Sequence, residues 1–249
     1  CQTVHYGSKR DTGERSDMNF EPVTPQNAEK LRPYYINCDY RLCEYSVGVK
    51  LMWGSVLRPA FCEAAGCLIV RNEIDGRWQF DFPVAGPEGD VEAALTLIER
   101  YCTEQGVRPV ISVVPEQEAS RLFLRYPVVR LINERPWKDY IYRRKDLAEF
   151  AGRHYSGQRN HINKFSSLYD WTFSPLRSED MEECMCLEEL WLQDAVLKNP
   201  NAETDYQNEK RIIRFLIENM EDLGVVAAAV RVEGKIVAFS LGSSINNDT

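Results

Sequence analysis

Residues 152–165 read GRHYSGQRNHINKF, and this pattern predicts one helix with two unlike faces. At about 100° per residue, the apolar side chains fall in one narrow arc and the polar side chains in another. The apolar arc consists of Tyr155, Ile162, Phe165 and Tyr169. The polar arc consists of Ser156, Asn160, Asn163, Lys164 and Ser167. We predict that the apolar arc is core between two lobes and that the polar arc faces a ligand.

The chain before this helix predicts one α+β lobe over residues 19–145, with a mixed central sheet flanked by helices. Residues 1–18 are polar and aperiodic, which predicts a flexible lead-in. Apolar alternation and turn signals predict strands at 20–23, 55–61, 67–71, 78–83, 109–114, 128–132 and 140–142. Helical spacing, with Thr24 and Asp90 as N-caps, predicts helices at 24–35, 44–52, 90–106 and 116–126.

The helix itself belongs to a basic connecting segment, 146–170, after which a similar order of elements begins again. A strand is expected at 171–173, helices at 178–192 and 206–223, and a hairpin at 225–232 and 235–241 across Glu233-Gly234. Repetition at an offset of about 150–170 residues indicates a structural duplication. Residues 171–249 are therefore expected to be the start of a second lobe, which is incomplete in this chain because its remaining elements would follow Thr249.

Composition narrows the class of protein. The 249 residues are 44% hydrophobic, which is enough to bury a core. The sequence contains no run of about 18 apolar residues, which is the length needed to cross a membrane. We therefore expect a soluble, cytoplasmic protein. Eight cysteines are present without a C-x-x-C pair, and only three histidines accompany them. This spacing predicts reduced, mostly buried cysteines and no metal site.

The charge is unevenly distributed along the chain. A formal net charge of −8 argues against a surface that binds nucleic acid throughout. A basic stretch nevertheless lies around the connecting segment and comprises Arg143, Arg144, Lys145, Arg153, Arg159 and Lys164. Two interpretations stay open: a solvated helix face, or a docking surface for an anionic cofactor or RNA.

The same part of the chain carries a family resemblance. It reads WKDYIYRRKDL at 137–147 and continues with the patterns G-x-x-Y and R-N-H-I-N-x-F within 152–165. This resembles the uncharacterised bacterial family grouped with the C-terminal domain of phosphatidylglycerol lysyltransferases, in which a D-Y-x-Y strand leads into such a helix. One departure is Gly157, which stands where a basic residue is common in that family.

The resemblance implies two tandem lobes of the GNAT (acyl-CoA N-acyltransferase-type) fold, similar to the Fem-type peptidoglycan aminoacyltransferases. It implies an acyl- or aminoacyltransferase that acts on an amine or hydroxyl acceptor, with acyl-CoA or aminoacyl-tRNA as the donor and tRNA as a partner. Lysyltransferases acylate a lipid headgroup, but their membrane-spanning half is not in this sequence, so a lipid acceptor is not favoured. The alternative is a non-catalytic ligand-binding protein that keeps a degenerate form of the fold.

The candidate site residues lie in or near this resemblance. The candidate catalytic residues can move a proton and are His161, Tyr140 and Tyr142. The candidate substrate-binding residues are cations and amides that would hold an anionic donor or polarise a carbonyl, namely Arg153, Arg159, Asn160, Asn163 and Lys164. Structural interpretations stay open for all of them: a packed histidine, tyrosines that pack in a strand, asparagines that bond loop backbone, and an interlobe ion pair for Arg159.

The first lobe offers residues 83–90, PVAGPEGD, where an acyltransferase that uses coenzyme A places its phosphate-binding loop. Backbone amides at a helix N-terminus hold the pyrophosphate in such loops. Here Pro87 lacks an amide hydrogen, and Glu88 and Asp90 would repel a phosphate. We predict that the first lobe does not bind coenzyme A.

Overall fold

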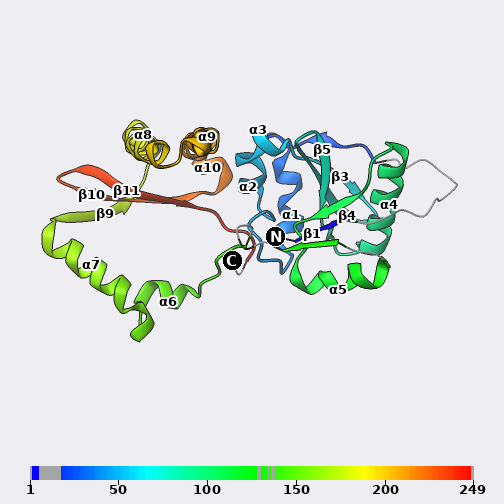
Figure 1. Cartoon of the computed structure of the whole chain (residues 1–249), viewed down its shortest axis with the longest axis horizontal. Helices are drawn as coiled ribbons and strands as arrows, with labels where there is room; N and C mark the ends of the chain where they lie inside the picture. The colour runs from blue at the N-terminus through cyan, green and yellow to red at the C-terminus, as the bar shows by residue number, and fades with distance from the viewer. Residues whose placement is uncertain (1, 6–17, 128–129, 134, 136–137, 248–249) are drawn as a thin grey trace. The chain divides into compact units, whose positions relative to one another are not determined.

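The computed structural model describes residues 2–5, 18–127, 130–133, 135 and 138–247. The chain divides into two compact units (Figure 1). Unit 1 comprises Cys1–Asp139 with Ser244–Thr249, and unit 2 comprises Tyr140–Ser243. Both units are α+β, and each is described by itself.

Unit 1 is built on a mixed sheet whose strands lie in the order β2-β3-β4-β5-β7-β1-β8, with β6 paired to β4. The strands are β1 (Gln2–His5), β2 (Glu21–Pro22), β3 (Ala60–Ala64), β4 (Cys67–Ile74), β5 (Arg77–Asp81), β6 (Val84–Ala85), β7 (Val110–Ser112) and β8 (Arg130–Asn133). The helices are η1 (Ala28–Lys30), α1 (Arg32–Ile36), α2 (Val47–Met52), α3 (Gly54–Leu57), α4 (Val91–Glu104) and α5 (Glu116–Arg125). Strands β5 and β7 pair in parallel, with Phe80 opposite Ile111, and α4 lies between them in the sequence.

Two-residue turns set the registers of the hairpins in both units. Ala65-Gly66 joins β3 to β4, Asp75-Gly76 joins β4 to β5, and Glu233-Gly234 closes the hairpin of unit 2. Both residues of every turn have positive φ, between 51° and 80°. Turns of this kind match the right-handed twist of paired strands, and glycine at the second position adopts positive φ without steric cost. The hairpin predicted across Glu233-Gly234 is therefore confirmed. The strands predicted at 55–61 and 67–71 also form a hairpin, but its turn is Ala65-Gly66 rather than residues 63–66, because β3 continues to Ala64.

The core of unit 1 lies where helices cover this sheet. Asp90 caps α4 as predicted, because its carboxylate accepts the amide hydrogen of Ala93 at 3.0 Å. The inward face of α4 is fully buried and consists of Ala94, Leu95, Ile98 and Cys102. Burying a side chain of leucine or isoleucine size contributes about 1.5–3 kcal/mol to folding. Burial of the apolar stripe that the sequence predicts therefore holds α4 against the sheet.

A buried ion pair lies inside unit 1. The ammonium of Lys50, on α2, contacts the carboxylate of Asp81, at the end of β5, and their side chains are only 4% and 3% exposed. The amide of Asn72, on β4, donates to the other oxygen of Asp81 at 2.8 Å. One helix and two strands therefore meet at a single carboxylate. The sequence did not predict this contact.

Unit 2 is a three-stranded antiparallel sheet, ordered β11-β10-β9, with helices against it (Figure 1). The strands are β9 (Trp171–Pro175), β10 (Val226–Val232) and β11 (Lys235–Gly242). The helices are α6 (Arg144–Glu149), η3 (Arg153–Tyr155), α7 (Ser156–Leu168), η4 (Ser178–Asp180), α8 (Met181–Lys198), η5 (Pro200–Ala202), α9 (Glu203–Glu218) and α10 (Met220–Leu223). Buried side chains between the sheet and helices α8 and α9 form its core: Leu176, Cys184, Met185, Ile217, Ala227, Ala229 and Ile236.

Polar contacts fasten α8 and the turn before it to the hairpin of unit 2. The guanidinium of Arg231, on β10, pairs with Asp180 at 2.5 Å and with Glu183 at 2.9 Å. The carboxylate of Glu183 also accepts the amide hydrogen of Ile236 at 2.7 Å. Burial opposes ionisation of Asp180 most strongly, but the amide hydrogen of Arg177 and then Arg231 lower its pKa overall. The amide hydrogen of Ile236, and after it Arg231, lower the pKa of Glu183.

Several predicted elements differ from the structure. Residues 140–142 form no strand, because alternating aromatic residues need a neighbouring strand to pair with and none lies beside them in the described part of the chain. Residues 2–5 of the predicted lead-in form strand β1, which pairs with β7 and β8, and residues 6–17 lie outside the described residues. The apolar arc of α7 is not core, since no residue of that helix is buried.

The strand predicted at 55–61 is wrong at its start, because Gly54–Leu57 form helix α3 and β3 begins only at Ala60. Several helix starts also differ. Thr24 caps no long helix; its amide donates to Asn27, and helix α1 begins only at Arg32, with Pro33 in its first turn. Helix α2 begins at Val47 rather than at residue 44, because Ser46 supplies the N-cap oxygen. Residues 178–180 form a 3₁₀ turn before α8 begins at Met181. Short caps and prolines thus divide segments whose apolar spacing alone predicts continuous helices.

Lys50→Met is expected to lower the free energy of unfolding by about 3–5 kcal/mol, because it leaves a buried carboxylate without its counter-charge. The matched control is Lys30→Met, since Lys30 forms an exposed pair with Glu21. That change should cost about 1 kcal/mol or less. Urea unfolding measures both, and equal effects of the two substitutions would contradict the role given to the buried pair.

Candidate functional site

Arg159 holds the corner between α6 and α7. Its guanidinium donates to the carbonyl oxygens of Phe150 and, at 2.8 Å, of Gly152. Both residues have positive φ, 45° and 87°, so the chain changes direction there. Carbonyl groups at the end of α6 are therefore left without a hydrogen-bond donor from the helix itself. Arg159 therefore bonds backbone in unit 2, and it makes no ion pair among the residues that the structure describes. Its position differs from the interlobe ion pair that the sequence left open.

The two histidines of the helix region have different surroundings. The ring centroid of His154 lies 4.0 Å from that of Tyr155, which lies 5.5 Å from that of Phe150. His154 is exposed but contacts these rings at the α6–α7 corner. His161 is exposed on α7, and its side chain has no hydrogen-bond partner in the described part of unit 2. An exposed imidazole without a partner remains accessible to a substrate.

The polar arc of α7 is exposed as the sequence predicts. Asn160, Asn163 and Lys164 all lie on the surface of unit 2. Across residues 140–243 as described, neither asparagine amide bonds to a loop. Tyr140 and Tyr142, in the irregular segment before α6, are 77% and 55% exposed. The structure thus leaves these candidate side chains free to contact a ligand, and within the described residues no contact joins them to one another.

The apolar arc of α7 clusters at its C-terminal end. The ring of Phe165 lies 5.1 Å from Tyr169 and 6.3 Å from Trp171, and the indole of Trp171 donates to Ser166 at 3.0 Å. Ile162 nevertheless stays 45% exposed. These contacts fix α7 to the start of β9, which holds the polar arc in one orientation relative to the small sheet.

Five exposed cations lie between residues 143 and 164 of unit 2, and together they are named the basic strip: Arg143, Arg144, Lys145, Arg153 and Lys164. None of them makes an ion pair within the described residues, whereas some exposed cations elsewhere, such as Lys30, Arg121 and Lys198, are paired with carboxylates. Unpaired exposed cations keep a positive local potential, which attracts phosphate groups. The strip is therefore the part of unit 2 best suited to an anionic ligand.

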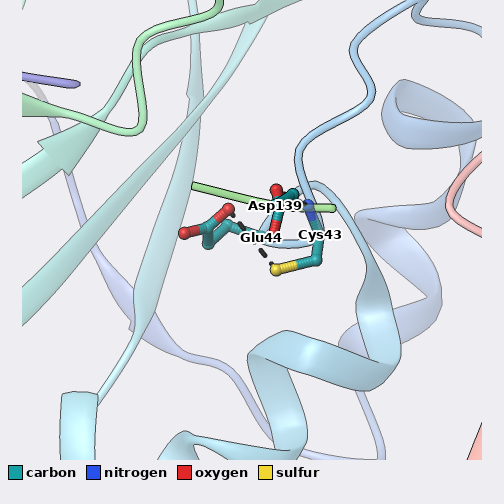
Figure 2. Close-up of side chains that lie close together, drawn as sticks. All are labelled: Cys43, Glu44 and Asp139. Carbon is teal, nitrogen blue, oxygen red and sulfur yellow. Dashed lines mark hydrogen bonds between the residues drawn. The ribbon is translucent and has the colours of Figure 1, made fainter. Parts of the chain in front are cut away.

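A second cluster, in unit 1, joins Cys43, Glu44 and Asp139 (Figure 2). Asp139 accepts the amide hydrogen of Cys43 at 3.1 Å, and the Cys43 thiol lies 3.6 Å from a Glu44 oxygen. Asp139 is the first residue of the D-Y-x-Y pattern, so this contact anchors the residue directly before Tyr140. Sequence reasoning missed Cys43 and Glu44, since they lie far from Asp139 in the chain.

Burial raises the pKa of both Glu44 and the Cys43 thiol. One candidate ligand atom from each of the three residues lies within 4.8 Å of the others. A thiol whose pKa is raised stays protonated, and Asp139 already accepts a backbone amide, so the set is poorly prepared for a cation. The absence of a metal site remains a prediction.

The loop at residues 83–90 is closed on the first hairpin. Its amides are used internally: Gly86 donates to Gly66 at 2.9 Å, Gly89 to Gly86 at 3.0 Å, and Asp90 to Ala65 at 2.9 Å. A Cβ on Gly89 would lie 2.6 Å from the Gly66 carbonyl oxygen, so only glycine allows this approach. Amides that already donate to carbonyls cannot also hold a pyrophosphate. This geometry supports the prediction that the first lobe does not bind coenzyme A.

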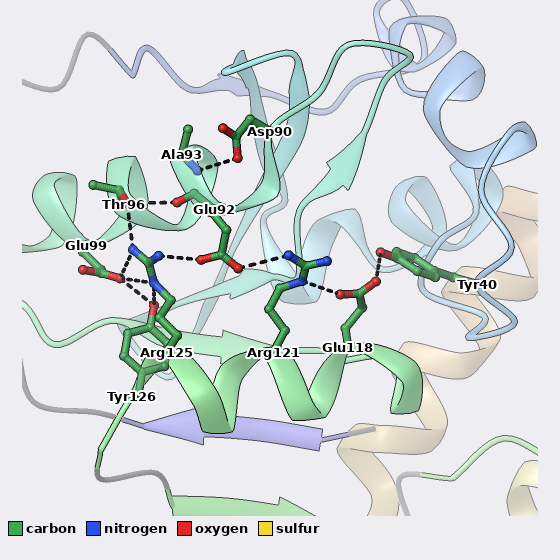
Figure 3. A network of polar contacts seen from close by, with 10 residues as sticks. All are labelled: Tyr40, Asp90, Glu92, Ala93, Thr96, Glu99, Glu118, Arg121, Arg125 and Tyr126. Carbon is green, nitrogen blue, oxygen red and sulfur yellow. Dashed lines mark hydrogen bonds and ion pairs between the residues drawn. The ribbon is translucent and has the colours of Figure 1, made fainter.

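Helices α4 and α5 are joined by a ladder of ion pairs (Figure 3). Arg125 contacts Glu92 at 2.7 Å and Glu99 at 2.8 Å, while Arg121 contacts Glu92 at 3.0 Å and Glu118 at 2.8 Å. An open groove lies along this ladder, lined by Glu92, Gln117, Glu118, Ser120, Arg121, Leu124 and Arg125. Because both arginines are neutralised by carboxylates, the groove offers no excess charge to a ligand, and we interpret the ladder as a link between the helices.

Comparisons with known proteins cover both units. The family model described as "Phosphatidylglycerol lysyltransferase, C-terminal" matches residues 39–249. A solved structure, a conserved protein of unknown function from Bacteroides thetaiotaomicron, is similar with a TM-score of 0.83 and 27% identity, over 92% of this chain and 76% of that one. No curated protein matches. In the described residues, no helix is long and apolar enough to cross a bilayer.

Glu44→Gln is expected to stabilise the protein more at pH 7 than at pH 4. A carboxyl group whose pKa is raised by folding leaves the folded state less stable as the pH rises above the unfolded value of 4.5, because the unfolded chain then loses its proton first. Glutamine has no such cost. Denaturant unfolding at the two pH values measures the difference.

The control for this experiment is Glu21→Gln. Lys30 lowers the pKa of Glu21, although burial opposes this, so the wild-type carboxylate contributes more stability as the pH rises. This substitution should therefore show the opposite sign between pH 4 and pH 7. A pH-independent effect of Glu44→Gln would contradict the raised pKa.

Proposed function

We propose, because the chain belongs to the family of phosphatidylglycerol lysyltransferase C-terminal domains, that it transfers an aminoacyl group from tRNA to an amine or hydroxyl acceptor. Family membership points to an aminoacyltransferase. The tRNA donor, the class of acceptor and the arrangement as tandem GNAT-like lobes are parts of the proposal. An acyl-CoA donor has less support, because the amides of Gly86, Gly89 and Asp90 in the loop at 83–90 already donate to carbonyls of unit 1.

The observation that carries the proposal is the unpaired basic strip beside exposed tyrosines. Phosphates of an RNA backbone would bind the five cations of the strip, and each neutralised phosphate releases counterions. Single-stranded nucleotides, such as those at the acceptor end of a tRNA, stack on exposed aromatic rings. Tyr140 and Tyr142 directly precede the first arginines of the strip and supply such rings.

In the proposed reaction, the acceptor nitrogen or oxygen attacks the carbonyl carbon of the aminoacyl ester. The new bond forms as the bond to the tRNA ribose oxygen breaks. The acceptor's proton passes to the imidazole of His161 and from there to the departing ribose oxygen. In the alternative, the phenol of Tyr140 or Tyr142 gives its own proton to the ribose oxygen as it takes the acceptor's proton. Asn160, Asn163 and Lys164 polarise the carbonyl, while Arg153 attracts the anionic donor. Arg159 holds the helix corner and acts on the donor only through its remaining N–H groups.

The rival function is binding without catalysis. In that case the fold and the basic strip would serve only to bind a ligand. The loop at residues 83–90 favours this alternative, because its amides are used for packing rather than for binding a phosphate. The two functions differ in what their variants do. A binding protein loses affinity when the strip is changed but shows no aminoacyl transfer in any form.

Replacing Arg144, Arg153 and Lys164 together by glutamine is expected to weaken aminoacyl-tRNA binding and to flatten its salt dependence. Each lost phosphate contact should reduce the slope of log affinity against log salt by about 0.7–0.9. The control is Arg58→Gln, an exposed arginine of unit 1 that pairs with Glu73. Filter binding at several salt concentrations measures both, and an unchanged slope would refute the RNA interpretation of the strip.

His161→Asn is expected to lower the rate of aminoacyl transfer by about 10²–10⁴-fold with tRNA affinity unchanged, if His161 moves the proton. Tyr140→Phe and Tyr142→Phe test whether either tyrosine moves the proton instead of His161. The matched control is His154→Asn, because His154 packs against Tyr155 at the helix corner. Transfer of a radiolabelled aminoacyl group to hydroxylamine, a simple amine and hydroxyl acceptor, gives the rates. Equal losses for both histidine variants would assign His161 a structural role.

A further inference from the structure

Glu188 lies where the pattern of α8 calls for an apolar residue. The inward face of this helix carries Cys184, Met185, Leu192 and Ala195, all buried, and Glu188 lies among them at 8% exposure. A carboxylate in an apolar stripe costs stability, since it must give up water. Residues that break a local folding rule in this way are concentrated at functional sites.

The carboxylate of Glu188 is not satisfied from within the protein. Its Oε1 atom is buried and has no hydrogen-bond partner among the described residues. The nearby cation, Lys210 on α9, is paired instead with the adjacent Glu189. Burial raises the pKa of Glu188, and the neighbouring carboxylate of Glu209 raises it further, whereas Lys210 opposes both. A ligand with a positive charge would offset both the cost of burying the Glu188 carboxylate and its repulsion by Glu209.

Aromatic rings stand in the same seam between α8 and α9. Trp191, one turn of α8 after Glu188, lies 5.4 Å from the ring of Tyr206 on α9, at 80° to it. Trp191 is half exposed and Tyr206 is partly buried, so the two rings lie at the solvent edge of the seam. Indole and phenol faces attract cations, and tryptophan does so most strongly. A buried carboxylate beside such rings is the combination that recognises an alkylammonium group.

We propose that the seam between α8 and α9 binds a primary ammonium group carried on an alkyl chain. The ammonium donates to the carboxylate of Glu188, and the alkyl chain packs on Trp191 and Tyr206. Glu209, exposed on α9, adds negative charge at the entrance. Lys210 competes for the same carboxylate, because its own ammonium reaches this region of the seam. The site goes beyond the proposed transfer reaction and does not depend on it.

The test uses n-butylammonium chloride as the probe and n-butanol as the uncharged control, with isothermal titration calorimetry on the full chain. We expect saturable binding of the ammonium alone. Glu188→Gln should weaken that binding at least tenfold, whereas Glu182→Gln, an exposed glutamate of the same helix paired with Arg214, should not. Lys210→Met should tighten binding several-fold, because it removes the internal competitor.

Trp191→Leu provides a second variant that keeps the carboxylate and should weaken binding severalfold. Thermal melting of each variant confirms that it is folded, and Glu188→Gln removes a buried charge without changing the size of the side chain. No saturable binding by the wild-type chain, or equal binding by Glu188→Gln, overturns the proposal. Because the assay needs neither RNA nor transfer, its failure is distinct from failure of the proposed function.

Discussion

The buried carboxylate of Asp81 is the constraint on which unit 1 depends. It lies at the point where β5 leaves its hairpin with β4 and pairs in parallel with β7, opposite Ser112. Lys50 and Asn72 bond its two oxygens, so a helix and the neighbouring strand are fixed to that point. A charge this deep is tolerated only while its partners stay in place. Packing of the helices on the sheet is therefore tied to the register of its strands.

The sequence predicts those parts of the fold that local chemistry decides. The Glu233-Gly234 turn, the Asp90 cap and the apolar stripe of α4 are each specified within a few residues, and each is confirmed. Lys50 could not be predicted in this way, because a lysine in a short amphipathic helix ordinarily points to solvent. Its burial depends on Asp81, which lies 31 residues further along the chain.

The candidate site shows the same division. The exposed polar arc of α7 and the basic strip follow from helical periodicity and charge, and the structure places both on the surface of unit 2. The prediction that the apolar arc of α7 is core was wrong, because helical spacing identifies an apolar face but does not show whether another element covers it. The anchoring of Asp139 by Cys43 also escaped prediction, since the two residues are 96 positions apart. Long-range contacts of this kind leave no local pattern.

The two units close the corner before a long helix in different ways. In unit 1 the amides of Gly86 and Asp90, before α4, donate to the Ala65-Gly66 turn, so this corner joins the loop to the first hairpin. In unit 2 the corner before α7 is closed by a side chain, Arg159, which bonds the carbonyls of Phe150 and Gly152. A side chain that satisfies the turn leaves the neighbouring cations and the polar arc unpaired. Positive charge therefore remains beside α7, and in the proposed reaction it would attract an anionic donor to unit 2 rather than to the loop of unit 1.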